Sequence, residues 1–496
     1  MPATATTPRT LSSGIPGLDT VLAGGLTADR LYLIEGAPGS GKTTLAMQFL
    51  LEGVRRGEKV LFITLSETAE ELREIAQSHG WDLGGVEVYE LLAHSRKLEG
   101  DAPYTMFHPS EIELAETTDR ILKLVETTKP QRLVFDSLAE LRLMSGSALR
   151  YRRHVLSFKQ SLAGQHCTTL LLDHAGGPDS GLTVHTIVHG VINLSSTAAD
   201  FGGDRHRVRV AKYRGRRVAG GYHDYRIQTG GLQVFPRLIA ADFRRENPRE
   251  TVHTGSSEFD ALLGGGLDRG TSTLLVGAAG TGKSSLATQV VVAAASRGEH
   301  AAMFAFDESL QSLLVRSTSM GFPLAPHIES GLVRVQAVDP AEFTSGEFTQ
   351  LIQRAVEEQG ARVVVIDSLN GYLNAMPQEN HMLLQLHELL AYLGSMGVVT
   401  ILVSAQLGLI GSMTSSVDVS YLADSVVLLR YFEAQGEIRR AISVLKKRTG
   451  NHERTIRPMH ASSRGLSIGE PLREFRGVLT GVPQELEAAP GNGESP

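Results

Sequence analysis

The apolar residues of this chain fall into short, nearly continuous runs rich in Val, Ile and Leu. Such runs are typical of strands covered on both faces, which indicates a mostly parallel sheet. Between them lie stretches with apolar residues at three-to-four spacing, such as Leu45, Phe49 and Val54, a spacing that predicts a helix. Each half of the chain is therefore predicted to be an α/β domain. The predicted strands are residues 31–36, 59–66, 132–136 and 167–173 in the first half and 274–280, 301–307, 362–367 and 398–405 in the second.

This pattern occurs twice. The stretch SGIPGLDTVLAGGL begins at Ser13 and returns as TGSSEFDALLGGGL at Thr254, while Lys42 corresponds to Lys283, 241 positions later. Self-similarity of this kind indicates a duplicated domain. The boundary falls in the polar, proline-containing segment 244–255, which has the composition of a linker. We expect a flexible N-terminus over residues 1–12, a first domain over 13–245, a second domain over 246–475 and a disordered tail over 476–496.

Composition is that of an ordinary soluble protein. The 496 residues are 42% hydrophobic and 21% charged, with a formal net charge of −6, and a chain of this length usually forms about two to four domains. No apolar run reaches the roughly 18 residues that cross a bilayer, and the N-terminus lacks the charged-then-apolar order of a secretion signal, so we expect a cytoplasmic protein. The single cysteine, Cys167, cannot form an internal disulfide and is interpreted as a buried core thiol.

Two glycine-rich stretches carry the clearest chemistry. GAPGSGKTT and GAAGTGKSS both satisfy the P-loop pattern G-x-x-x-x-G-K-[ST], each between a predicted strand and a predicted helix. The glycines let backbone N–H groups turn toward phosphate oxygens at a helix start, and the lysine contacts the terminal phosphates. One match can arise by chance, but two in the same context predict a nucleotide ligand. The predicted phosphate-binding residues are Gly36, Gly39, Ser40, Gly41, Lys42, Thr43, Thr44, Gly277, Gly280, Thr281, Gly282, Lys283, Ser284 and Ser285.

Each P-loop is accompanied by residues suited to Mg²⁺. The hydroxyl groups of Thr43 and Ser284 follow the two lysines, at the position that ligates Mg²⁺ in P-loops. The apolar strands LVFDS and VVIDS contain Asp136 and Asp367, which we expect to lie beside the loops and to hold the ion, usually through water. An aspartate that ends a strand is often only a cap for the next segment. Its place about 90 residues after a P-loop favours the metal role here.

A carboxylate is also needed to orient or deprotonate the attacking oxygen. The segments TLSETAEEL and FAFDESLQSL follow the P-loop helices and place Glu67 and Glu308 at the carboxyl edge of the sheet, with Asp307 as a second acid in the later half. The alternative is that these acids stabilise the first turn of the next helix. Position alone leaves both interpretations open.

The tandem halves, the SGIPGLD opening, the P-loops, the acids after the second strand and the strand-ending aspartates together resemble the KaiC family of clock ATPases and autokinases, over roughly residues 10–470. The resemblance implies two RecA-like domains that bind ATP and Mg²⁺ in a homo-hexameric double ring. It also implies that a Lys-x-Arg motif on a late strand reaches the phosphates of the adjacent subunit's ATP. The matching residues are Lys212, Arg214, Lys446 and Arg448.

The catalytic acids depart from the family pattern. KaiC has two glutamates in tandem, whereas this chain has Ser66 before Glu67, so that Glu67 would act alone in the first half. In the second half the pair is Asp307 and Glu308, and the sequence does not decide which of them is the base.

The phosphorylated pair of the family is also altered. KaiC phosphorylates adjacent Ser and Thr residues in its second half, and this chain keeps Ser420 but has Tyr421 at the threonine position. A tyrosine hydroxyl projects farther, so a site built for threonine would not hold it in the same attack geometry. We therefore expect a single phosphosite at Ser420, with packing of Ser420 between strands as the alternative.

Three functional classes fit these motifs. The favoured one is an ATP-hydrolysing, ring-forming signalling protein with Ser/Thr autokinase activity in its second domain, a division of labour that the resemblance implies. The second is a RecA-like DNA-dependent ATPase, against which the net charge of −6 and the pI near 6.3 count. The third is a nucleotide-sensing scaffold with little turnover. The tail 476–496 is either a docking segment for a signalling partner or a loose end.

Overall fold

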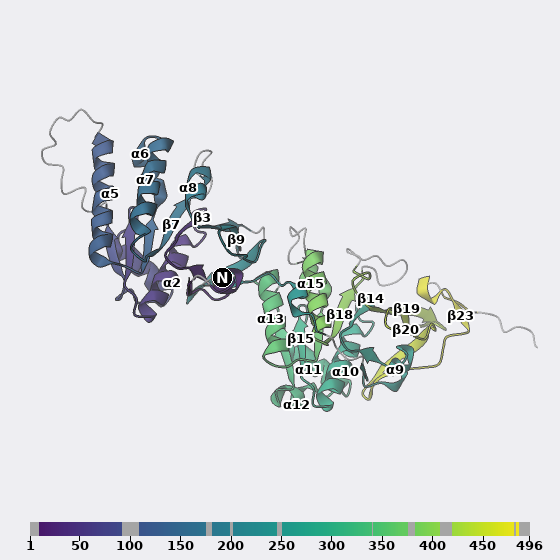
Figure 1. The fold of residues 1–496 in the computed structure, drawn as a ribbon. Helices are drawn as coiled ribbons and strands as arrows, with labels where there is room; N and C mark the ends of the chain where they lie inside the picture. The colour runs from purple at the N-terminus through teal and green to yellow at the C-terminus, as the bar shows by residue number, and fades with distance from the viewer. Residues whose placement is uncertain are drawn as a thin grey trace, which may run out of the picture. The chain divides into compact units, whose positions relative to one another are not determined.

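The computed structural model describes residues 9–91, 109–174, 181–198, 202–245, 250–339, 341–374, 382–406, 419–480 and 483–485. Contacts divide the chain into two compact units, Met1–Arg237 and Leu238–Pro496. Each unit is built around one nine-stranded sheet flanked by helices (Figure 1). The predicted fold class, two tandem α/β domains with mostly parallel sheets, is confirmed.

The first unit has its sheet in the order β11-β10-β9-β8-β3-β7-β6-β4-β5, in which the six strands from β8 to β5 run parallel and β9, β10 and β11 are antiparallel. Its strands are β1 (Thr10–Leu11), β2 (Leu26–Thr27), β3 (Leu31–Gly36), β4 (Val60–Thr64), β5 (Glu87–Glu90), β6 (Arg132–Asp136), β7 (Thr168–His174), β8 (Gly190–Thr197), β9 (Arg205–Tyr213), β10 (His223–Gln228) and β11 (Gly231–Phe235). Its helices are α1 (Leu18–Val21), α2 (Lys42–Arg55), α3 (Ala69–Ser78), α5 (Pro109–Thr128), α6 (Leu138–Ser145), α7 (Ala148–Leu162) and α8 (Gly181–Ile187).

Successive residues along the strands point to opposite faces of the sheet and so fill two layers of core. In β3, Tyr32 and Ile34 face a cluster that includes α1, α2 and α3, while Leu31 and Leu33 face a cluster formed with α5, α6, α7 and α8. Figure 1 shows α5 to α8 gathered on one side of the sheet. The continuous apolar runs in the sequence arise because both faces of the parallel strands are covered. The thiol of Cys167 lies in the second of these clusters, which confirms that it is a buried core residue.

The second unit repeats the arrangement in the order β16-β15-β17-β18-β14-β19-β20-β21-β22, parallel from β16 to β19 and antiparallel beyond. Its strands are β12 (Thr251–Val252), β13 (Leu267–Asp268), β14 (Ser272–Gly277), β15 (Ala301–Ala305), β16 (Val333–Ala337), β17 (Val363–Asp367), β18 (Val399–Ala405), β19 (Ser425–Ala434), β20 (Glu437–Lys447), β21 (Arg457–Ser462), β22 (Gly465–Ile468), β23 (Phe475–Arg476) and β24 (Gln484–Glu485). Its helices are η1 (Ala240–Phe243), α9 (Ser257–Leu262), α10 (Lys283–Ser296), α11 (Leu310–Ser319), α12 (Leu324–Glu329), α13 (Ser345–Glu357), α14 (Leu369–Asn374), α15 (Met382–Ser395) and η2 (Val478–Thr480).

The predicted N-terminal segment, linker and C-terminal tail lie only partly within the described residues. Residues 1–8 of the predicted N-terminus and 246–249 of the predicted linker lie outside them, as do 481, 482 and 486–496 of the predicted tail. The described part of the tail has regular structure: β23 pairs with β24, and Val478 is buried against Phe432 and Ala441. An apolar residue that finds such a cluster is held in place even within a polar, glycine-containing segment.

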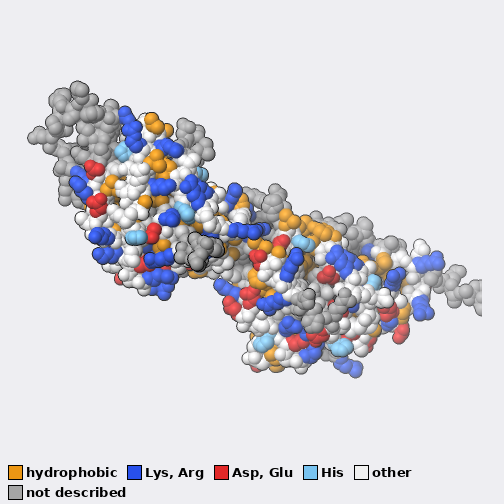
Figure 2. All heavy atoms as spheres, viewed as in Figure 1, with side chains coloured by type: hydrophobic (Ala, Val, Ile, Leu, Met, Phe, Trp, Pro, Cys, Tyr) orange, Lys and Arg blue, Asp and Glu red, His pale blue; other side chains and the backbone are white. Residues whose placement is uncertain are grey.

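The surface carries both signs of charge. On the face drawn in Figure 2, Lys and Arg side chains are interspersed with Asp, Glu and His side chains over both units. No helix within the described residues is long and apolar enough to cross a membrane.

Candidate functional site

The two P-loops lie between the central strand and the first long helix of each unit. Gly36 ends β3 and Lys42 begins α2, and Gly277 and Lys283 take the same places at β14 and α10. The helix N-termini therefore open at the carboxyl edge of the sheet, where their N–H groups attract anions. These positions confirm the strand–loop–helix context predicted for both motifs.

The lysines and glycines of the loops are held in defined conformations. The Lys42 Nζ donates to the carbonyl oxygens of Gly36 at 2.9 Å and Ala37 at 3.0 Å, which curls the amine back over the loop. Lys283 donates to the equivalent carbonyls at 2.9 and 2.7 Å, and burial lowers its pKa to about 8. Gly277 cannot be replaced without a shift, because a Cβ there would lie 2.0 Å from the carbonyl oxygen of Leu429.

Two of the predicted phosphate-binding residues have side chains that face the interior of the loop. Ser40 and Thr281 are fully buried, and the Thr281 hydroxyl donates to the carbonyl of Ala278 at 2.9 Å. Their side chains support the loop from inside. Among the predicted residues of the helix starts, Thr44 Oγ1 lies 3.4 Å from His79 Nε2.

A hydroxyl and a carboxylate meet beside each P-loop. Thr43 Oγ1 donates to Asp136 Oδ2 at 3.2 Å, and Ser284 hydrogen-bonds Asp367 in the second unit. Burial raises the pKa of both aspartates above the ordinary value, so an opposite charge at this point would be stabilising. Paired hydroxyl and carboxylate oxygens suit Mg²⁺. The described residues include no cluster of three His, Cys, Asp or Glu side chains that could hold a metal.

The candidate bases Glu67 and Glu308 lie outside the helices that follow them. Helix α3 is capped by Thr68, with Glu71 completing a capping box, so Glu67 lies before the cap and outside the first turn. Glu308 likewise precedes the cap of α11, Ser309. The alternative interpretation of these acids, as first-turn residues, does not fit the observed helix starts.

Glu67 and the acids of the second unit have different surroundings. The Glu67 Oε2 is buried and accepts no hydrogen bond from the described residues, and burial, followed by the charge of Asp136, raises the pKa of Glu67 to about 6. Asp307 accepts a 2.5 Å hydrogen bond from the Ser368 hydroxyl. Glu308 is ion-paired with Arg316 at 2.7 Å.

The four predicted Lys-x-Arg cations lie at the opposite edge of each sheet from the P-loop of the same unit. The Lys212 Nζ donates to the carbonyls of His185 and Val188, and Arg214 Nη2 donates to the carbonyl of Thr186 at 2.7 Å, all just before β8 begins. The amino ends of parallel strands and their carboxyl ends are separated by about 3.3 Å per residue, so these cations cannot reach their own phosphate site.

The second unit shows the same geometry around the predicted phosphosite. The Lys446 Nζ donates to the carbonyl of Ser420 at 3.0 Å, and Arg448 Nη2 donates to the carbonyl of Tyr421 at 2.7 Å. Ser420 therefore lies just before β19, next to the Lys-x-Arg motif and away from Lys283 of the same chain. The Tyr421 side chain is exposed.

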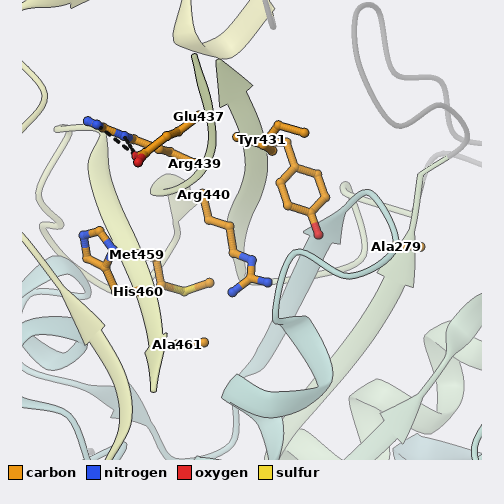
Figure 3. A pocket seen from close by; sticks show the side chains of 9 residues that line it. Ala279, Tyr431, Glu437, Arg439, Arg440, Met459, His460 and Ala461 are labelled. Atoms are coloured by element: carbon orange, nitrogen blue, oxygen red, sulfur yellow. Dashed lines mark hydrogen bonds and ion pairs between the residues drawn. The ribbon is translucent and has the colours of Figure 1, made fainter. Parts of the chain in front are cut away.

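A pocket of about 940 Å³ beside the second P-loop holds residues that the sequence analysis missed. In Figure 3 the Arg440 guanidinium extends from β20 toward the loop that carries Ala279, and the Tyr431 hydroxyl faces the same loop. The stretch GEIRRAISV contains Arg440, but its sequence does not indicate a role. The pairing of β20 with β19, in which Arg440 lies opposite Tyr431, brings the arginine to the loop. In the first unit His206 takes the place of Arg440.

Comparison with known proteins agrees with this geometry. The sequence model of the family described as "ATPase: KaiC" matches residues 11–239 and 252–473, one match for each unit. The chain is 28% identical over 482 residues to the circadian clock protein KaiC3 of Synechocystis sp., covering 95% of this chain and 94% of that protein. It is 26% identical to the circadian clock oscillator protein KaiC of Parathermosynechococcus lividus, covering 96% and 88%, and 26% identical to that of Synechococcus elongatus, covering 95% and 91%. Duplicated P-loop units, the acids beside them and these matches over nearly the full length together place the chain in the KaiC family of ATPases, with two tandem RecA-like domains.

Proposed function

We propose that both units bind ATP together with Mg²⁺. The loop N–H groups and the lysines Lys42 and Lys283 hold the phosphates, and the bound Mg²⁺ would screen the charge between the β- and γ-phosphates. Thr43 with Asp136 and Ser284 with Asp367 are the residues that would hold the ion. The observation that supports this is the repeated contact of hydroxyl and carboxylate beside each P-loop lysine.

We infer that ATP hydrolysis is assisted by a carboxylate that orients or deprotonates the attacking water. In the first unit Glu67 has this role, because it lies at the carboxyl edge beside the P-loop with a carboxylate oxygen that accepts no hydrogen bond from the described residues. In the second unit Asp307 or Glu308 has it, and both lie between β15 and α11. A base that is active near neutral pH needs a pKa close to that range, and the raised pKa of Glu67 meets this requirement.

Each site is completed by a neighbouring copy of the chain. Lys212, Arg214, Lys446 and Arg448 lie at the sheet edge remote from their own P-loops, and cations in that place can act on phosphate only between subunits. Head-to-tail contacts of this kind form a ring when the rotation between successive subunits closes. We infer a homo-hexamer with two stacked rings, as the family membership suggests, in which assembly and catalysis are coupled.

The second unit is also an autokinase that phosphorylates Ser420. Ser420 lies next to Lys446 and Arg448, so the contact that brings these cations to a neighbour's ATP also brings the Ser420 hydroxyl there. The phosphoryl group would then pass from the ATP of one subunit to Ser420 of its neighbour. The same position makes Tyr421, whose exposed side chain is longer, a poor substitute for threonine.

Incubation with γ-labelled ATP followed by mass spectrometry tests this function. The wild-type chain is expected to release phosphate and to carry label on Ser420, whereas Ser420→Ala is expected to hydrolyse ATP without labelling. Label that persists in Ser420→Ala excludes Ser420 as the phosphosite. A wild-type chain that hydrolyses ATP without label is an ATPase alone, and one that binds ATP without turnover is a scaffold.

A further inference from the structure

The two units differ at one helix position close to the candidate bases. Helix α3 follows β4 in the first unit and α11 follows β15 in the second, and their starts are 241 residues apart. At matching positions the first unit has Ile75 and the second has Arg316. A guanidinium group thus enters the second site where the first site has an aliphatic side chain.

Arg316 engages both oxygens of Glu308. Its Nη2 donates to Glu308 Oε2 at 2.7 Å and its Nε donates to Oε1 at 3.1 Å, while Nη1 donates to Ser285 Oγ at 3.2 Å. The two side chains are 24% and 28% exposed, so the pair is largely shielded. A two-point contact between guanidinium and carboxylate is among the stronger charge-assisted hydrogen bonds. Both carboxylate oxygens of Glu308 are therefore held by Arg316 of α11, which is itself hydrogen-bonded to the first turn of α10.

The other acids are not fastened in this way. The backbone of Glu67 is fixed by Thr64, whose hydroxyl accepts from the Glu67 N–H at 3.0 Å, but its Oε2 accepts no hydrogen bond from the described residues. Asp307 is exposed, and from the described part of the chain it accepts a hydrogen bond from Ser368 at Oδ2. Within the described residues, neither carboxylate is bound at both oxygens by a cation as Glu308 is.

We propose that Arg316 is a positioning residue that withdraws Glu308 from proton transfer and leaves Asp307 as the base of the second site. This inference rests on the proposed ATP hydrolysis in that unit. The base takes one proton from a water molecule as the water oxygen bonds to the γ-phosphorus, the bond from the γ-phosphorus to the leaving oxygen of ADP breaks, and the proton then passes to solvent. Glu308 can take that proton only after its pair with Arg316 opens.

The two sites would then use acids at different positions of the same motif. The first uses the second acid position, Glu67, because Ser66 precedes it and Ile75 leaves it unbound. The second uses the first position, Asp307, because Arg316 holds Glu308.

The test uses the full-length chain with Glu67→Gln, which removes the base of the first site and leaves its phosphate loop intact, so that the measured ATP turnover belongs to the second site. Adding Asp307→Asn is expected to lower kcat about 100-fold, the usual range for loss of a general base. Adding Arg316→Ile to that chain installs the residue of the first unit and frees Glu308. We expect kcat to recover about tenfold or more, since a general base is again present. A further Glu308→Gln substitution is expected to abolish this recovery.

Recovery that depends on Glu308 is a readout that a purely structural role for Arg316 would not produce. Arg316→Lys, which keeps the charge but offers a single-point contact, is expected to restore less than Arg316→Ile, and Arg316→Gln serves if the isoleucine variant unfolds. The inference is overturned if Asp307→Asn leaves turnover unchanged, or if neither Arg316→Ile nor Arg316→Gln restores it in a chain that still binds ATP.

Failure of the proposed function gives a different result. A Glu67→Gln chain without any turnover would refute ATP hydrolysis by the second unit. In that case Arg316→Ile must create turnover that Glu308→Gln removes, because it frees a carboxylate beside the phosphates. Absence of turnover in that variant as well would overturn the role of Arg316.

Discussion

Glu67 combines a position at the carboxyl edge of the first sheet with a raised pKa. The residue lies after β4, outside the first turn of α3, with a carboxylate oxygen that accepts no hydrogen bond from the described residues. Burial disfavours the charged form, and the nearby carboxylate of Asp136 adds to the effect, so the pKa rises from an ordinary value of 4.5 to about 6. A base with this pKa is ionised at neutral pH and still able to accept a proton.

We therefore expect the ATPase activity of the first unit to fall as the pH drops through about 6. Below that value Glu67 is protonated and cannot accept a proton from water, whereas above it the carboxylate is ionised and the rate is independent of this group. The measurement is kcat/KM against pH in a Lys283→Ala chain, in which the second site is disabled. Glu67→Gln in the same chain is the control and should lack this limb; an identical limb in the control would assign the titration to another group.

Arg132 is a charged residue that the first unit buries completely. Its guanidinium pairs with Glu58, donates to the carbonyls of Ser12 at 2.9 Å and Phe49 at 2.8 Å, and lies over the Phe49 ring. Removing one partner of a buried pair leaves the other partners without hydrogen bonds and is strongly destabilising. The residue thus ties the N-terminal segment to α2 and the sheet.

Arg132→Met is expected to destabilise the first unit by about 3 kcal/mol. Arg9→Met removes the same charge at an exposed position and should change stability by less than about 0.5 kcal/mol. Denaturant unfolding followed by the fluorescence of Trp81, the only tryptophan of the chain, reports on the first unit. Equal stability of the two variants would show that the buried contacts contribute little.

At the level of the elements, the antiparallel strands distinguish the two sites. In the second unit β20 brings Arg440 to the pocket beside the P-loop. In the first unit β9 brings His206, which stacks on Tyr225 and whose pKa is lowered by burial, so the ring is neutral at pH 7. The corresponding strands β20 and β9 therefore carry a positive charge at this position in the second unit and a neutral ring in the first.

Arg440→His, which installs the residue of the first unit, should weaken ATP binding by the second site about tenfold, the value of one charge-assisted hydrogen bond. Calorimetric titration of ATP into a Lys42→Ala chain, in which the first site is disabled, measures the second site alone. Arg439→His is the control, since Arg439 forms its ion pair with Glu437. Equal affinity in both variants would place Arg440 away from the nucleotide.

For the assembled protein, the position of Ser420 predicts phosphate transfer between subunits. A chain with Lys283→Ala cannot hold the phosphates of ATP in its second site, and a chain with Ser420→Ala cannot accept phosphate. Each alone should remain unlabelled by γ-labelled ATP. Mixed together, they should form rings in which Ser420 of the Lys283→Ala chain is labelled, as mass spectrometry can assign. A mixture without label, beside a labelled wild type, would show that transfer occurs within one chain.

Much of the fold was predictable because parallel strands covered on both faces must be apolar along their whole length. Residues 31–36 and 132–136 were predicted as strands and are β3 and β6. The Lys-x-Arg motif was expected on a late strand, which is β9 (Arg205–Tyr213), but its antiparallel pairing and the following strands β10 and β11 were not predicted. Strands with one solvated face alternate and include many charged residues, so their pattern is weaker than that of buried parallel strands. Their place in the sheet depends on pairing with β8, which no local pattern encodes.

The P-loops, the aspartates that follow them and the duplication were determined by the sequence alone, because phosphate binding needs particular residue types at fixed local spacing. Which acid is free and which is bound was decided only by the tertiary structure. Arg316 on α11 turns back to Glu308, eight positions earlier and before the helix begins, and Arg440 reaches the P-loop from a strand more than 150 positions later. Contacts of that kind follow from how helices and strands pack in three dimensions, and their members carry no shared spacing in the chain.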